Sequence, residues 1–95
     1  MKLPKRLIVF GQIVKVEYAE MDESVGGLCH PDGLIQISNM LEKKHVDQIL
    51  IHELVHAIFG RVSLYQVISP SIEEIIAEAI SKTICENFVI KAKKL

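Results

Sequence analysis

The chain has few of the features that mark the more specialised classes of protein. Its 95 residues contain no tryptophan, two tyrosines and three phenylalanines, and the formal net charge is −1. A near-neutral chain with so few aromatic side chains lacks the basic patch and the stacking surfaces of nucleic-acid-binding proteins, so we expect no nucleic acid partner. Cys29 and Cys85 form no disulfide framework; free thiols in a reducing cytoplasm are expected, with one bridge between them as the alternative.

Long apolar runs are absent as well. A membrane-spanning helix needs roughly 18 consecutive apolar residues, and the apolar region of a secretory signal needs about 7–15. The run that follows the basic residues near the N-terminus is only Leu7–Phe10, so we expect neither a membrane span nor a signal peptide. Apolar residues make up 49% of the chain and charged residues 24%, which is the balance of a folded globular protein. The length predicts a single domain over residues 1–95.

Strand signals occupy the first third of the chain. Residues 7–18 are rich in isoleucine and valine and alternate with polar residues near their end, which predicts one long strand or two strands broken at Gly11. Two short apolar runs, residues 26–30 and 34–38, flank the turn sequence Pro31-Asp32-Gly33. This arrangement predicts a β-hairpin.

Helical signals follow. Residues 41–59 contain no proline and carry apolar side chains at helical spacing, and Gly60 offers a stop. A second helix is expected from about Ser69-Pro70-Ser71 to about residue 88, with a wide apolar stripe made of Ile72, Ile75, Ile76, Ala79, Ile80, Thr83 and Ile84. The order of elements predicts an α+β domain in which two or three antiparallel strands are followed by two helices.

The most informative motif is His52-Glu53-Leu54-Val55-His56, in the first predicted helix. Histidines at this spacing lie about 40° apart around a helix and roughly 6 Å apart along it. Both imidazoles can therefore reach one Zn²⁺ ion, and Glu53 flanks the same face. This is the metal-ligand and general-base arrangement of zinc-dependent peptidases.

A catalytic zinc site usually has three protein ligands, and the second helix offers Glu73, Glu74 and Glu78. One of these carboxylates can bind the metal while another fixes the tautomer of a ligand imidazole. Spacing alone does not choose among them. A helical wheel places Glu73 on the flank of the apolar stripe and Glu74 nearer the polar side. Ser71-x-x-Glu74 also matches a capping box, in which Glu74 would serve the helix N-terminus instead.

The two motifs together resemble those of the gluzincin metallopeptidases. His52-Glu53-Leu54-Val55-His56 followed by Glu73-Glu74-Ile75-Ile76-Ala77-Glu78 is most similar to the minigluzincins and to small phage- or prophage-type metallopeptidase domains, over roughly residues 26–88. The resemblance implies Zn²⁺ as the metal, Glu74 as the third ligand and Glu78 as the acid that hydrogen-bonds His52. Glu73 stands where the family often has asparagine, and Glu78 stands where it has aspartate.

The resemblance also implies a fold and a mode of substrate binding. The expected fold is a minimal zincin-like domain, in which a small antiparallel sheet packs on the active-site helix and on the second, glutamate-bearing helix. In such a domain the edge strand, here carrying Gly27, Leu28 and Cys29, binds an extended peptide or protein substrate as an added β-strand.

The expected chemistry is hydrolysis of a peptide bond. Zinc lowers the pKa of bound water from about 15.7 to about 7, and Glu53 would take the proton and pass it to the leaving amine. Tyr65 and His30 are the suggestive oxyanion donors, although a structural role is favoured for each. Two alternatives stay open: a zinc-binding but catalytically silent or latent regulatory or binding module of phage or prophage type, and a small α+β protein without metal. An oligomer or a protein partner that completes the exposed cleft is a further option.

Overall fold

The structure, a computed structural model, describes residues 2–93. Within this range the elements follow in the order β1 (Arg6–Val9), β2 (Gln12–Ala19), β3 (Gly27–Cys29), β4 (Ile35–Ser38), α1 (Lys43–Arg61), a 3-10 helix η1 (Leu64–Gln66) and α2 (Pro70–Asn87). The α+β class expected from the sequence is confirmed. No helix within the same residues combines the length and the apolar character needed to cross a membrane.

The sheet differs from the expected one in the number and direction of its strands. Four strands lie in the order β1-β2-β4-β3, and β2 pairs with β4 in parallel, so the prediction of two or three antiparallel strands is wrong. Of the two alternatives for residues 7–18, two strands broken at Gly11 is confirmed. The chain folds back at Phe10 and Gly11, whose φ angles of 48° and 76° suit a two-residue hairpin turn. The antiparallel hairpin of β3 and β4 lies with β4 next to β2 and parallel to it, which leaves β3 at the edge of the sheet. Ile35 and Ile37 of β4 are fully buried, whereas Leu28 of β3 is 46% exposed at the sheet edge.

The predicted hairpin of residues 26–38 is confirmed. Strand β3 pairs antiparallel with β4, with Leu28 opposite Gln36. In the turn, the backbone N–H of Gly33 donates to the carbonyl of His30, and a carboxylate oxygen of Asp32 accepts a hydrogen bond from the backbone N–H of Leu34 at 3.1 Å. Gly33 has a φ of 92°, a conformation that favours glycine. The turn chemistry read from the sequence therefore fixes the position of the edge strand.

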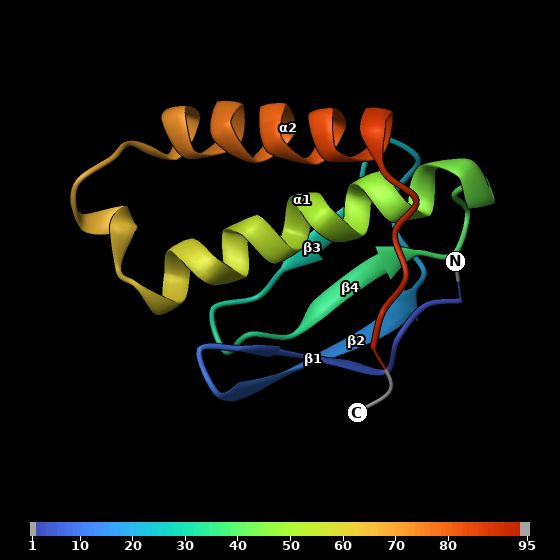
Figure 1. Ribbon diagram of the computed structural model, residues 1–95, viewed down its shortest axis with the longest axis horizontal. Helices are drawn as coiled ribbons and strands as arrows, with labels where there is room; N and C mark the ends of the chain where they lie inside the picture. The colour runs from blue at the N-terminus through green and yellow to red at the C-terminus, as the bar shows by residue number, and fades with distance from the viewer. Residues whose placement is uncertain (1, 94–95) are drawn as a thin grey trace.

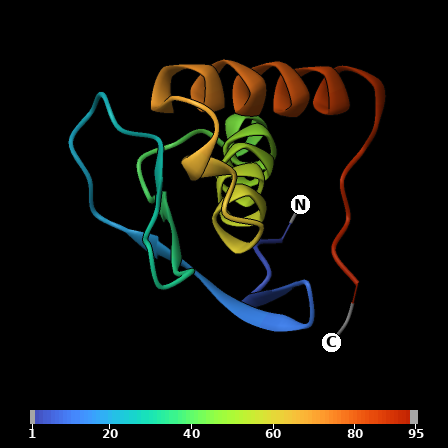
Figure 2. The same cartoon turned by 90° about the vertical axis from the view of Figure 1, so that its left-hand side faces the viewer.

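Helix α1 lies between the sheet and α2, so the molecule has three layers (Figures 1 and 2). The main core fills the space between the sheet and α1, and its buried members are Val9, Val14, Val16, Ile35, Ile37, Val46, Leu50 and Ala57. Gly60 is not the stop that the sequence suggested, because α1 continues to Arg61. The residue with left-handed backbone after the helix is Ser63, with a φ of 57°.

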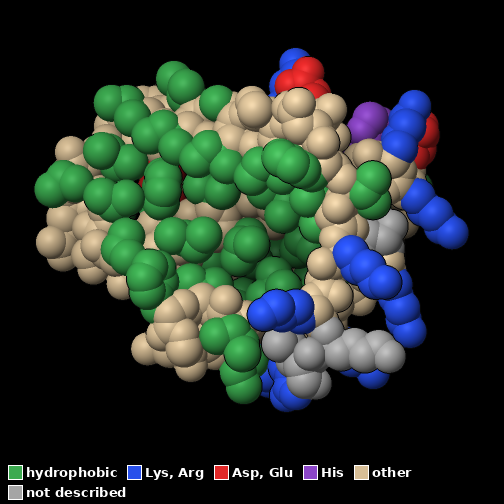
Figure 3. Space-filling view, viewed as in Figure 1, with side chains coloured by type: hydrophobic (Ala, Val, Ile, Leu, Met, Phe, Trp, Pro, Cys, Tyr) green, Lys and Arg blue, Asp and Glu red, His purple; other side chains and the backbone are tan. Residues whose placement is uncertain are grey.

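Helix α2 begins and ends close to where the sequence predicts, but it packs through a different face. Ala77 and Ser81, two small residues, are fully buried on α2, and α1 is the element against which α2 packs. The isoleucines of the expected stripe lie to the side of this contact, and Ile72, Ile75 and Ile80 are 48%, 68% and 39% exposed. The apolar stripe named from the sequence is therefore mostly exposed. Hydrophobic side chains extend across the face of the molecule seen in Figure 3.

Candidate metal centre

The histidine motif lies in the middle of α1, on the part of the helix that faces α2. His52 and Glu53 are buried, with relative exposures of 6% and 7%, and the side chain of His56 is 20% exposed. Because no glycine or proline interrupts this stretch, regular helical geometry places the two imidazoles one turn apart on the same side. The rings are 5.0 Å apart between centroids.

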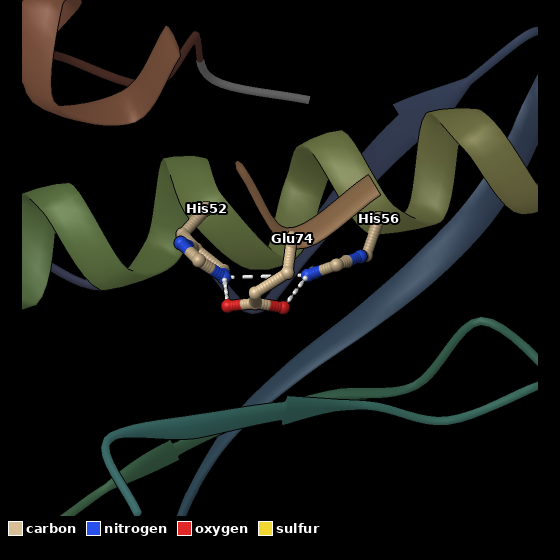
Figure 4. A group of neighbouring side chains, drawn as sticks. All are labelled: His52, His56 and Glu74. Carbon is tan, nitrogen blue, oxygen red and sulfur yellow. Dashed lines mark hydrogen bonds and ion pairs between the residues drawn. The ribbon is translucent and has the colours of Figure 1, made fainter. Parts of the chain in front are cut away.

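Glu74 of α2 meets both imidazoles (Figure 4). One carboxylate oxygen of Glu74 is 2.7 Å from Nε2 of His52, and the other is 3.0 Å from Nε2 of His56. The two Nε2 atoms are 3.2 Å apart. Metal–ligand bonds of about 2.0–2.1 Å in a tetrahedral zinc site separate the donor atoms by about 3.3 Å. The two nitrogens and the carboxylate thus have the chemistry and approximate spacing of three zinc ligands.

The capping alternative for Glu74 is wrong. The N-cap of α2 is Ser69, whose hydroxyl accepts a hydrogen bond from the backbone N–H of Ile72 at 3.3 Å, so Ser71 already lies inside the helix. The side chain of Glu74 is 60% exposed, in keeping with its predicted place near the polar side of the helix. Although Glu74 is exposed, its carboxylate still reaches both histidines from the polar side of α2.

The other two glutamates differ in how they approach the histidines. Glu73, which is 18% exposed, has a carboxylate oxygen 2.8 Å from Nδ1 of His56. A carboxylate oxygen of Glu78 is 3.7 Å from Nδ1 of His52, which is longer than a hydrogen bond. Nδ1 of His52 is buried without a hydrogen-bond partner within residues 2–93, and Glu78 instead accepts a hydrogen bond from Gln48 at 2.6 Å. Sequence reasoning missed the contact of Glu73 with His56, although the place of Glu73 beside the apolar stripe was a signal for its burial.

Burial and neighbouring charges shift the pKa of two groups in the centre. Burial raises the pKa of Glu53; His52 and His56 act in the opposite direction, and Glu74 adds to the rise. Burial alone would lower the pKa of His56, but its hydrogen bond to Glu73 and the carboxylates of Glu53 and Glu74 outweigh burial and raise it. Glu53 therefore has a carboxylate that binds a proton more readily than an exposed one, as a general base requires.

A cleft of about 550 Å³ passes over this centre. Strand β3 forms one wall with Gly27, Leu28 and Cys29, so the three edge-strand residues expected to bind substrate lie across from the histidines. Gly27 lies tightly on α1: a Cβ atom at this position would be 2.8 Å from Cγ2 of Ile49 and 3.1 Å from Cγ of Glu53. The missing side chain thus allows the edge strand to lie directly beside the proposed base.

Both suggested oxyanion donors, His30 and Tyr65, also line the cleft. Nε2 of His30 is 2.7 Å from the side-chain oxygen of Gln36, so this nitrogen is already engaged. Tyr65 lies in η1 and is 62% exposed. Arg61 also lines the cleft, and sequence reasoning missed it. The available signal was a basic residue in the last turn of the helix that carries the motif.

The cysteines are free thiols, as expected. Cys29 lies on β3 in the wall of the cleft, and its pKa is raised to about 11 by burial first and then by the carboxylates of Glu53, Glu73 and Asp32, while Arg61 lowers it. Because the thiolate is the reactive form, Cys29 is a neutral and unreactive thiol at pH 7.

Comparison with protein-family models, with curated proteins and with solved structures found no match to this chain. The likeness to gluzincins therefore depends on the motif residues alone.

Proposed function

We propose that the protein is a zinc-dependent peptidase with a minimal zincin-like, gluzincin-type arrangement. The observation that carries this proposal is the position of Glu74, whose two carboxylate oxygens reach Nε2 of both His52 and His56. The buried Glu53 lies beside them in the same cleft. A zinc ion held by the two histidines and Glu74 would lower the pKa of a coordinated water and polarise the scissile carbonyl.

The residues around the ligands prepare them for this task. A neutral histidine that donates from Nδ1 to the Glu73 carboxylate keeps the lone pair of Nε2 for a metal ion, so Glu73 fixes the tautomer of His56. Glu78 lies close enough to His52 to favour a proton on Nδ1 through its charge. Together the two acids favour Nε2 as the metal-binding atom of each imidazole.

Glu53 is the general base in this proposal. Its carboxylate is not needed as a ligand, and it adjoins both the histidines and strand β3. It would accept a proton from the attacking water and deliver it to the leaving amine. Its raised pKa favours the first transfer, because a carboxylate with a higher pKa is a stronger base toward the attacking water.

The substrate would be an extended peptide segment lying along β3. Among the described strands, β3 pairs with β4 alone, so its other edge faces the cleft. Backbone groups of Gly27, Leu28 and Cys29 can extend the sheet by one strand, which binds a peptide with little regard to its side chains.

The test is cleavage of a peptide mixture by zinc-reconstituted protein and by Glu53→Gln. We expect the wild type to cleave, and the variant to retain zinc while losing cleavage by about 10²–10⁴-fold. Glu86→Gln, an exposed change elsewhere on α2, is the control and should behave as the wild type. Zinc binding without cleavage in the wild type would favour the silent or latent binding module instead. Failure to retain zinc would favour the metal-free alternative.

A further inference from the structure

Arg61 is the last residue of α1 and one of the residues that line the cleft. It follows His56 by five positions, which corresponds to about 7.5 Å along a helix. Its guanidinium lies against the hairpin turn, where a Cβ atom on Gly33 would be 3.0 Å from Nη2. The glycine therefore leaves the space that the guanidinium occupies between the end of α1 and the β3–β4 turn.

This cation has no partner within residues 2–93. None of the ion pairs or side-chain hydrogen bonds of these residues involves Arg61, although Glu53, Glu73 and Glu74 line the same cleft. Asp32, in the adjacent turn, accepts a hydrogen bond from a backbone N–H. A half-buried guanidinium with its donors unused is suited to bind a carboxylate, which it can hold through two parallel hydrogen bonds.

A role at the helix end does not account for this placement. A basic residue in the last turn stabilises the helix dipole, but an exposed lysine would do the same. Arg61 instead extends its side chain along the cleft wall, where its charge opposes the influence of burial and of nearby carboxylates on the Cys29 thiol of β3.

We propose that Arg61 selects substrates that carry a carboxylate about two residues from the scissile bond. The offset of about 7.5 Å along α1 between His56 and Arg61 equals about two residues of an extended peptide that runs beside the helix and rises about 3.3 Å per residue. The carboxylate is either the free C-terminus or an aspartate or glutamate side chain. This inference rests on the proposed peptidase function, and it gives that function a substrate class.

The probes are short peptide hydroxamates, in which the hydroxamate binds zinc and a variable group follows two residues away. Three versions carry a free C-terminal carboxylate, a glutamate with an amidated end, or a glutamine with an amidated end. The free-carboxylate version carries the hydroxamate at the N-terminal side. The glutamate and glutamine versions are made with it at either side, because the direction in which the peptide runs past Arg61 is not fixed in advance. Binding to the zinc-loaded protein is measured by calorimetry, which requires no cleavage.

We expect at least one carboxylate version to bind the wild type about 10–100-fold more tightly than the glutamine version, as for a hydrogen bond to a charged group. Arg61→Gln should remove the preference and Arg61→Lys should retain part of it. Lys82→Gln, an exposed change on α2, should leave it intact. The unfolding temperature of each variant shows whether it is folded. Which version is preferred distinguishes a C-terminal from a side-chain carboxylate.

Equal affinity for all versions, or a preference that survives in Arg61→Gln, would overturn the inference and leave the peptidase proposal intact. If none of the hydroxamates binds the zinc-treated wild type, the proposed metal centre is wrong, and the role of Arg61 falls with it. The two failures are therefore distinguishable in one experiment.

Discussion

A carboxylate oxygen of Glu73 lies 2.8 Å from Nδ1 of His56, whereas the nearest carboxylate oxygen to Nδ1 of His52 belongs to Glu78 and is 3.7 Å away. The two histidines of the motif are thus held unequally. The better-oriented one is paired with the acid that directly precedes Glu74, so a single turn of α2 supplies both a candidate ligand and an orienting group.

The first prediction compares the three glutamates of α2. Glu74→Gln should weaken zinc binding most, because it removes a ligand. Glu73→Gln should weaken it by about 10–100-fold, as for loss of an orienting partner. Glu78→Gln should have the smallest effect, since Glu78 makes no hydrogen bond to His52 and is engaged by Gln48. Competition with a chromophoric chelator measures all three. A larger loss in Glu78→Gln than in Glu74→Gln would contradict the ligand assignment.

The second prediction concerns Gly27. An alanine there would place its Cβ 2.8 Å from Ile49 and 3.1 Å from Glu53. We expect Gly27→Ala to lower the free energy of unfolding by about 1–3 kcal/mol, as other overpacked positions do. Gly60→Ala is the matched control: it meets no atom within 4 Å inside α1 and should raise stability by about 0.5–1 kcal/mol. Urea unfolding measures both, and equal stability of the two variants would show that β3 does not lie on α1 as described.

The third prediction is the pH dependence of the metal-free protein. The raised pKa of His56 contributes stability that is fully present below pH 6.5 and is lost as the pH rises through the raised value. The raised pKa of Glu53 acts in the same direction, starting from 4.5. The free energy of unfolding in the presence of a chelator should therefore fall between about pH 5 and 8, by at most about 1.4 kcal/mol per pH unit for each proton.

Two further measurements check the cause of this pH dependence. Glu73→Gln should make the fall shallower, because it removes the hydrogen bond that raises the pKa of His56. Saturating zinc should reverse the trend, since the metal binds neutral histidines and competes with protons. Stability of the chelated wild type that is constant or rising over this range would disagree with the described environment of His56.

The fourth prediction uses Cys29 as a reporter of charge in the cleft. In metal-free Cys85→Ser protein, the rate of alkylation against pH should give a thiol pKa of about 11. Glu53→Gln should lower this value and Arg61→Gln should raise it, because the carboxylate and the guanidinium act on the thiol in opposite directions. Mass spectrometry of the alkylated protein follows the reaction. Shifts of the opposite sign would mean that these side chains are not arranged around Cys29 as described.

Local sequence signals were sufficient for part of the fold and site. The hairpin around Pro31–Gly33, the extent of α2 and the pairing of His52 with His56 on one helix face all depend on residues close in sequence. The parallel pairing of β2 with β4 was not predictable in this way, because it depends on which strand best fills the centre of the sheet.

Helix packing was also beyond the reach of local signals. The isoleucine stripe is the most apolar face of α2, but the residues buried on the helix that packs against α1 are the small Ala77 and Ser81. Glu73 lies one helical turn before Ala77, on the same face of α2. This face therefore brings Glu73 to His56. The position of Arg61 in the cleft likewise depends on a turn that is distant in sequence.

The central claim is that His52, His56 and Glu74 bind a single zinc ion. The most direct measurement is a crystal structure of the zinc-loaded protein with anomalous data at the zinc absorption edge. We predict one strong anomalous peak about 2.0–2.2 Å from Nε2 of His52, Nε2 of His56 and a carboxylate oxygen of Glu74, with Glu53 outside the coordination sphere. A peak elsewhere, or none between these three side chains, would contradict the account.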